Sequence, residues 1–282
     1  MMSKILLADS GSTKTEWTLL EDNMVVRSLY TEGINPNQAK DEVIAKMLLK
    51  TELRSFAPAR IYFYGSGCGS AEGKAIVKSA LEAIFTAAEI TIESDLFAAA
   101  RALCGSEKGI VAIMGTGSSS CLYDGSRIAE QRPSLGFILG DEGSGAVLGK
   151  MFIRKLLYGE LPPEITAKFY GEFPIDKDAI IARVYREPYP NRFLATFAGF
   201  IAEHKQQAAI NEIIRDNFNS FIRSHLSRYT DAKKMPIHFT GSIAHHFAEE
   251  MQGLLQWNGY TMGKIEQSPM QGLIRYHQQN HK

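Results

Sequence analysis

A pattern of apolar strand, short turn and second strand occurs twice in the sequence, and this repetition constrains the fold more than any other feature. The first copy spans residues 4–20 and the second spans residues 109–123. In both, the turn is rich in Gly, Ser and Thr. Connections this short join antiparallel strands, because a parallel pair needs a crossover of a dozen residues or more. Each copy therefore predicts the start of a meander, and the chain predicts two similar halves.

Alternating strand and helix signals follow each copy. After expected strands at 4–8, 15–20 and 24–30, the apolar spacing predicts helices and strands in alternation at 38–53, 60–64, 71–87, 89–93 and 96–103. This order combines a meander with crossovers, which predicts an α/β protein with a mixed sheet covered by helices.

The second half restarts the pattern near residue 110, where we place a domain boundary. Strands are expected at 109–114 and 120–123, and Asp124-Gly125 predicts a hairpin. Residues 145–230 are mostly helical in pattern, including an amphipathic stretch at 207–228. A strand at 236–239, a segment at 257–265 and a helix from Met270 complete the chain.

Composition excludes several classes of function. The 282 residues carry 31 Lys and Arg against 31 Asp and Glu, without the basic stripe that nucleic-acid binding requires. No window has the roughly eighteen apolar residues of a membrane span, and the start lacks a signal peptide, so we expect a cytoplasmic protein. The three cysteines, with no CxxC pair, predict buried thiols rather than disulfides or a zinc site.

Four turns that follow apolar strands share one composition. Glycine lets successive N–H groups converge on an anion, and Ser and Thr add hydroxyl donors. None is a Walker A loop or a GxGxxG motif, so any nucleotide site must be built in another way. The four turns are 9–14 (DSGSTK), 65–70 (GSGCGS), 115–120 (GTGSSS) and 240–244 (TGSIA).

Three acidic positions accompany these turns. Asp9 ends the first strand, Asp95 follows the fifth, and Asp141-Glu142 lies in LGDEGSG. Phosphoryl transfer needs a carboxylate for Mg²⁺ and a base near the acceptor hydroxyl. Each acid also has a structural interpretation, because Ser94 or Asp95 would cap a helix and acids are favoured at helix starts.

These motifs, in their order along nearly the whole chain, resemble those of the actin-like ATPase and sugar-kinase superfamily. GTGS followed by GDEGS is most similar to the N-acetylglucosamine kinases and the related BadF/BadG/BcrA/BcrD ATPase family. The resemblance implies two ribonuclease H-like domains with mixed βββαβα sheets flanking a central cleft. It places one domain at 1–110, joined by the C-terminal helix 268–282, and the other at 111–267 with a helical insertion at about 145–230.

The resemblance also implies a role for each matching residue. The activity would be ATP-dependent phosphorylation of the 6-hydroxyl of an amino sugar, with Asp95 as the catalytic base. ATP and Mg²⁺ are the implied substrate and cofactor. The implied metal residue is Asp9; the ATP-binding residues are Ser10, Gly11, Ser12, Thr13, Lys14, Gly115, Thr116, Gly117, Ser118, Gly241 and Ser242; the sugar-binding residues are Asn35, Ser66, Asp95, Thr116 and Asp141.

Two departures from the family pattern concern the sugar pocket. Leu135 stands where the mammalian enzyme has Trp, and Ser119 stands where it has Asn. N-acetylglucosamine and glucosamine therefore both stay open as acceptors, and a homodimer is one option for assembly. Two other classes of protein also stay open. One is an ATPase activase of a dehydratase or reductase, although the spacing of the three cysteines here does not match that of the cysteines that hold the activases' iron–sulfur cluster. The other is a non-catalytic sugar sensor. His245-His246 is expected at the surface rather than on a metal.

Overall fold

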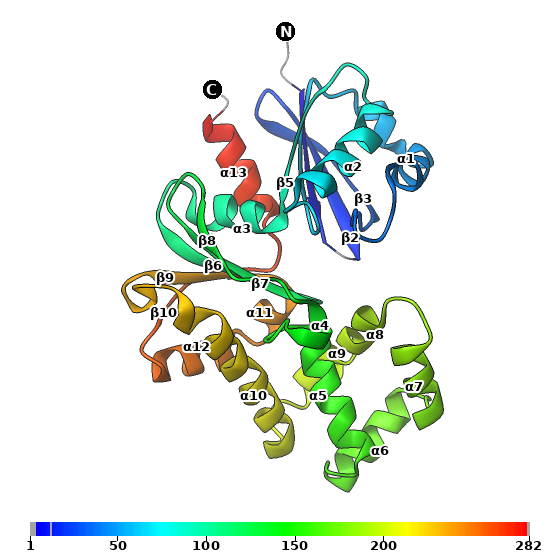
Figure 1. Ribbon diagram of the computed structural model, residues 1–282, viewed down its shortest axis with the longest axis vertical. Helices are drawn as coiled ribbons and strands as arrows, with labels where there is room; N and C mark the ends of the chain where they lie inside the picture. Colours follow the sequence, from blue (N-terminus) through cyan, green and yellow to red (C-terminus); the bar gives the residue numbers. More distant parts are fainter. Residues whose placement is uncertain (1–3, 12, 281–282) are drawn as a thin grey trace. The chain divides into compact units, whose positions relative to one another are not determined.

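The computed structural model describes residues 4–11 and 13–280 (Figure 1). Its contacts divide the chain into two compact units. Unit 1 contains the described residues up to Glu107 together with those from Pro269 onward, and unit 2 is Lys108–Ser268.

Unit 1 contains a five-stranded mixed sheet in the order β3-β2-β1-β4-β5. The first three strands form an antiparallel meander, and β4 and β5 continue the sheet in parallel with β1. The strands are β1 (Lys4–Ser10), β2 (Lys14–Glu21), β3 (Met24–Glu32), β4 (Arg60–Gly65) and β5 (Glu89–Ser94).

Helices cover both faces of this sheet. Because side chains alternate along a strand, Leu6 and Ala8 of β1 pack with α1 and α2, while Ile5 and Leu7 pack with α3 and α13. The last helix, red in Figure 1, lies beside α3. The helices are α1 (Asp41–Leu49), η1 (Glu52–Phe56), α2 (Ala71–Glu82), α3 (Asp95–Cys104) and α13 (Met270–Asn280).

Unit 2 contains a second five-stranded mixed sheet, in the order β10-β9-β6-β7-β8. Read from β8, this order repeats that of unit 1, with a meander followed by two parallel strands. The predicted repetition and the α/β class with two mixed sheets are confirmed. The strands are β6 (Gly109–Met114), β7 (Ser118–Tyr123), β8 (Ile128–Gln131), β9 (Pro236–Thr240) and β10 (Thr261–Glu266).

The helical part of unit 2 is a series of separate helices around one large apolar core. Pro163 and Pro190 stand at the first positions of α6 and α8, where a missing backbone N–H costs nothing. The helices are α4 (Gly136–Leu139), α5 (Gly145–Leu157), α6 (Pro163–Glu172), α7 (Lys177–Tyr185), α8 (Pro190–Thr196), α9 (Ala198–Glu203), α10 (Ala208–Ser224), η2 (Leu226–Arg228), η3 (Ala232–Lys234), α11 (Ser242–His246) and α12 (Ala248–Trp257).

Some element ends differ from the sequence expectations. The first strand continues past its expected end at residue 8, because the ladder to β2 includes Asp9 and Ser10. The helix expected at 38–53 stops at Leu49 and is followed by the short helix η1, whose N-cap is Thr51. Trp257 ends α12, so the last strand begins only at Thr261.

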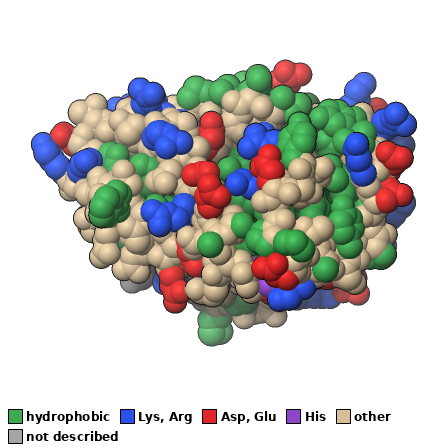
Figure 2. All heavy atoms as spheres, turned by 90° about the horizontal axis from the view of Figure 1, so that it is seen from below, with side chains coloured by type: hydrophobic (Ala, Val, Ile, Leu, Met, Phe, Trp, Pro, Cys, Tyr) green, Lys and Arg blue, Asp and Glu red, His purple; other side chains and the backbone are tan. Residues whose placement is uncertain are grey.

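The surface carries mixed charge on the face shown in Figure 2, where Lys and Arg alternate with Asp and Glu. No continuous basic stripe runs across that face. Across residues 4–11 and 13–280, no helix has the length and apolar character needed to span a bilayer.

Candidate functional site

The first turn of unit 1 lies between β1 and β2. Gly11 N–H donates to Lys14 O at 3.0 Å, and Thr13 O accepts from Gly33 N–H at 3.0 Å. Lys14 is exposed, with its Nζ 5.0 Å from the centre of the Tyr30 ring. This turn therefore presents a cation to solvent, as a phosphate site would require, while the predicted Ser12 lies outside the described residues.

Ser10 has a different environment from the rest of this turn. It is fully buried, its Oγ lies 2.7 Å from Thr15 Oγ1, and it donates to Ile34 O and accepts from Ile34 N–H. The hydroxyl thus fixes the segment that precedes Asn35. The predicted contact of Ser10 with phosphate stays a prediction.

Asp9 is half-buried at the end of β1, opposite Glu16 on β2 and Tyr64 on β4. Burial, with smaller contributions from the nearby Asp95 and Glu16 and against the opposing effect of Lys14, raises the pKa of its carboxyl to about 7. The negative charges of Asp95 and Glu16 near Asp9 favour a cation at this end of β1. Oxygen ligands of this kind, with substrate phosphates and water, are what Mg²⁺ prefers, so Asp9 fits the metal role.

Asp95 is the first residue of α3, and Ser94 caps that helix by accepting from Phe97 N–H. The Asp95 carboxylate accepts from Leu96 N–H at 2.8 Å and is hydrogen-bonded by the Ser66 side chain. Burial raises the pKa of Asp95, whereas these hydrogen bonds lower it. Of the two cap residues that the sequence allowed, the structure therefore has Ser94 as the N-cap and Asp95 as the first helical residue.

Asn35 and Ser66 lie beside these acids. Gly67 has φ +83°, and a Cβ built on it would lie 2.5 Å from Asn35 Oδ1, so the turn after β4 packs directly on Asn35. Ser66 N–H donates to Ser10 O at 3.0 Å. The carboxyl ends of the parallel strands β1, β4 and β5 thus bring together Asp9, Ser66 and Asp95, and Asn35 packs on the turn that follows β4. Ligands commonly bind at such strand ends.

Unit 2 holds the GTGS loop against the start of α5. Gly115 O accepts from Gly145 N–H at 2.8 Å, and Thr116 O accepts from Ala146 N–H at 3.2 Å. Within the loop, Gly115 N–H donates to Gly117 O at 3.0 Å. Residues 115–118 are therefore fixed by backbone contacts that do not depend on a ligand.

Asp141 lies directly against this loop. Its carboxylate accepts from Ser118 N–H, and a Cβ on Gly117 would lie 3.1 Å from Asp141 Oδ2. Burial and the neighbouring Glu142 raise the pKa of Asp141, while the Ser118 N–H and Lys150 lower it. The structure thus joins a predicted sugar residue to the predicted phosphate loop.

Gly241 brings the turn at 240–244, the second of the four turns to lie in unit 2, against the GTGS loop. Its φ is +109°, and a Cβ added to it would clash with the backbone oxygen of Met114, the residue that precedes Gly115. Only glycine fits here. Ser242, at the start of α11, is exposed.

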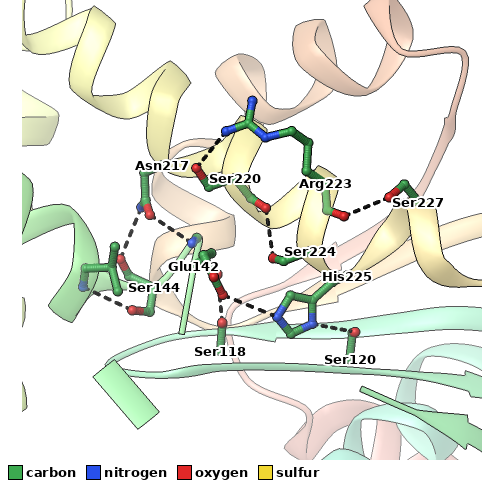
Figure 3. A network of polar contacts seen from close by, with 12 residues as sticks. Ser118, Ser120, Glu142, Ser144, Asn217, Ser220, Arg223, Ser224, His225 and Ser227 are labelled. Carbon is green, nitrogen blue, oxygen red and sulfur yellow. Dashed lines mark hydrogen bonds and ion pairs between the residues drawn. The ribbon is translucent and has the colours of Figure 1, made fainter. Parts of the chain in front are cut away.

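A polar network beneath the GDEGS loop was not predicted from the sequence (Figure 3). Asn217 of α10 contacts Gly143 and Ser144, and Ser118 Oγ donates to Glu142 O at 2.7 Å. His225 Nδ1 lies 2.9 Å from Ser120 Oγ, and burial lowers the pKa of the imidazole. The available signal was Asn217 itself, a polar residue at an apolar position of the stripe in 207–228.

Other candidate groups are not gathered into a site. Within the described part of the chain, no three His, Cys, Asp or Glu side chains are grouped for a metal ion. His245 and His246 are exposed, as predicted. The three cysteines are buried.

Comparisons with known proteins agree with this architecture. A solved structure from Porphyromonas gingivalis, named “Putative N-acetylglucosamine Kinase”, is similar at 40% identity, covering 99% of this chain and 100% of that chain with a TM-score of 0.94. A protein of the same name from Chromobacterium violaceum is 18% identical, covering 97% and 98% of the two chains with a TM-score of 0.76.

A ROK family glucokinase from Streptomyces griseus, solved with glucose and AMPPNP, shares the fold. It is 12% identical, and the match covers 98% of each chain with a TM-score of 0.60. No curated protein matches the chain. The model of one protein family matches residues 8–274, and the chain therefore belongs to the BadF/BadG/BcrA/BcrD ATPase family.

Proposed function

We propose that this protein is an ATP-dependent sugar kinase that phosphorylates the 6-hydroxyl of an amino sugar. N-acetylglucosamine is the first candidate acceptor and glucosamine is the second. The observation that carries the proposal is the Asp95 carboxylate, half-buried beside Asp9 and hydrogen-bonded by Ser66 where the parallel strands of unit 1 end. The 40% identity to the Porphyromonas gingivalis protein supports the same activity.

Asp95 is the proposed base. As the sugar oxygen bonds to the γ-phosphorus, the bond from that phosphorus to the bridging oxygen breaks and ADP leaves. The proton of the hydroxyl passes to the Asp95 carboxylate. The raised pKa of this carboxyl makes it a better proton acceptor than an exposed aspartate, and its fixed position aligns the hydroxyl for attack.

The phosphates are the proposed ligands of two turns. One is the turn from Ser10 to Lys14, including the Lys14 ammonium, and the other is Gly115–Ser118. Asp9 would hold Mg²⁺, which neutralises charge on the β- and γ-phosphate oxygens when it is bound. Gly241 and Ser242 would contact the adenosine.

The sugar is the proposed ligand of the residues that match the family's sugar site. Besides Asp95, these are Asn35, Ser66, Thr116 and Asp141. A carboxylate such as Asp141 accepts hydrogen bonds from sugar hydroxyls, and such charge-assisted bonds are about twice as strong as neutral ones.

The activase alternative is less well supported. An iron–sulfur cluster shared across a dimer needs cysteine sulfurs at the protein surface. Cys68 and Cys121 have no exposed area, and Cys104 is 7% exposed. Burial also raises the pKa of the Cys68 thiol to about 12, whereas a metal-bound cysteine is a thiolate.

A sugar panel tests the proposal. The protein is incubated with Mg²⁺, ATP and one sugar at a time, and ADP release is followed in a coupled assay. The panel contains N-acetylglucosamine, glucosamine, N-acetylmannosamine, glucose and 6-deoxy-N-acetylglucosamine. We expect an amino sugar to stimulate ADP release, the 6-deoxy sugar not to, and NMR of the product to show phosphate on O6.

Two results would contradict the proposal. Absence of sugar-stimulated ADP release across the panel would exclude the kinase. If a sugar raises the thermal midpoint without turnover, the sensor alternative replaces it.

A further inference from the structure

Asn217 is a polar side chain buried in an apolar helix face. It lies on α10 among Ile213, Ile214, Phe218 and Phe221, and all five side chains have no exposed area. Burying an amide without hydrogen bonds is costly, so a residue of this kind at a core position has a specific partner.

Both ends of the Asn217 amide bind the same loop. Oδ1 accepts from Gly143 N–H at 2.8 Å, and Nδ2 donates to Ser144 O at 3.2 Å (Figure 3). One side chain therefore clamps two consecutive residues of the GDEGS loop. Gly143 N–H is buried and is bonded by Asn217, whereas Ser144 O accepts from Leu148 N–H at 3.0 Å as well as from Asn217.

This loop needs such a clamp because its backbone is unusual. Asp141 has φ +58° and Gly143 has φ +82°. A left-handed conformation is uncommon for a residue with a side chain, and it persists where the surroundings impose it. Ser118 holds the loop from β7 by donating to Glu142 O, and Asn217 holds it from α10.

We infer that Asn217 is a positioning residue that fixes the GDEGS loop so that the Asp141 carboxylate is held ready for the sugar. The inference rests on the proposed function, in which Asp141 binds sugar hydroxyls. Asn217 acts through the backbone of Gly143 and Ser144 and has no contact of its own with substrate. Its loss should weaken sugar use more than ATP use.

Three variants separate positioning from simple stability. Asn217→Leu keeps the branched shape and the number of side-chain heavy atoms and removes both hydrogen bonds. Asn217→Asp keeps an oxygen that accepts from Gly143 N–H, and it replaces Asn217→Leu if that variant does not fold. Ile214→Val removes one methylene from the same helix face and leaves the loop contacts intact, so it is the control for lost packing.

Kinetics and hydrogen exchange give independent results. We expect Asn217→Leu to lower kcat/KM for the sugar by about ten- to a hundredfold, because small misplacements of binding groups are costly. KM for ATP should stay within about threefold. Amide exchange in a peptide covering 140–146 should be at least about tenfold faster than in the wild type, since the protecting acceptor is lost. Asn217→Asp should show smaller changes, and Ile214→Val should match the wild type in all three.

The outcomes distinguish this inference from the proposed function. If the wild type is active and Asn217→Leu equals Ile214→Val in sugar KM, kcat and exchange, the positioning role is overturned. If the wild type has no sugar-dependent turnover, the proposed function fails, and the exchange result then decides whether Asn217 anchors the loop.

Discussion

Replacing Asp95 with Asn tests the proposed base with little change in shape. The amide oxygen can still accept from Leu96 N–H, which now donates to Asp95 Oδ1 at 2.8 Å. Ser94 still caps α3. What is lost is the ability of the side chain to take a proton from the sugar hydroxyl.

The size of the loss follows from general-base catalysis. A positioned base contributes about 10²- to 10⁴-fold, so kcat should fall by that factor, equivalent to about 2.7–5.4 kcal/mol in the barrier. Stability should not fall, because the neutral amide removes a half-buried carboxylate that lies beside Asp9. The Kd for ATP, measured by titration calorimetry, should stay within about twofold.

The assay compares sugar-dependent ADP release of Asp95→Asn with that of Asp176→Asn. Asp176 caps α7 in unit 2 and accepts from Ala179 N–H at 2.8 Å, so the control makes the same chemical change at another helix start. We expect wild-type kcat in the control. A kcat for Asp95→Asn within about threefold of the wild type would remove Asp95 from the proposed mechanism.

Three further changes test other parts of the structure. Asp141→Asn should raise the sugar KM by about ten- to a hundredfold and leave the KM for ATP little changed, since a hydrogen bond to a charged group contributes about 1.5–3 kcal/mol. An equal rise in the KM of both substrates would contradict the sugar role. Gly241→Ala should destabilise unit 2 by about 2 kcal/mol or more and weaken ATP binding, because φ is +109° and Met114 O leaves no room for a Cβ. The control is Gly253→Ala on α12, where a Cβ would meet open space. In urea unfolding this control should be neutral or more stable by about 0.5–1 kcal/mol. Burial lowers the pKa of His225 in the folded state, so the folded protein binds fewer protons than the unfolded chain, and stability should fall as pH drops below the ordinary histidine pKa of 6.5. His225→Gln should reduce the dependence of the thermal unfolding midpoint on pH between pH 5 and 8. An unchanged pH dependence would refute the reasoning.

Local sequence patterns predicted the sheets because strands and turns are encoded by neighbouring residues. The two meanders, the crossovers and the α/β class follow from alternation and turn chemistry, and the structure has them. Strand ends were less predictable. The ladder through Asp9 and Ser10 depends on pairing with Glu16 and Thr15, which apolar spacing does not reveal.

The arrangement of the candidate site needed three-dimensional information. Sequence alone singled out Asp95 and Asp141, whose roles stay predictions. It could not indicate that Ser66 bonds Asp95, or that Ser118 N–H is directed at the Asp141 carboxylate. The second of these contacts depends on the left-handed backbone at Asp141 and on the close approach at Gly117, which are set by tertiary packing.

The position of α13 has a consequence for the order in which the protein is made. This helix gives Met270, Leu273 and Ile274 to the core beneath β1, and its Gly272 packs directly on Ala102 of α3. Unit 1 is thus discontinuous in sequence, with all of unit 2 lying between its parts. On the ribosome, the strand that carries Asp9 and the helix that begins at Asp95 emerge before unit 2. One face of their sheet is then covered by α3 alone until the helix after Pro269 is synthesised. Unit 2, which is continuous, has its own core available earlier, so chaperone protection during translation would matter most for the first hundred residues.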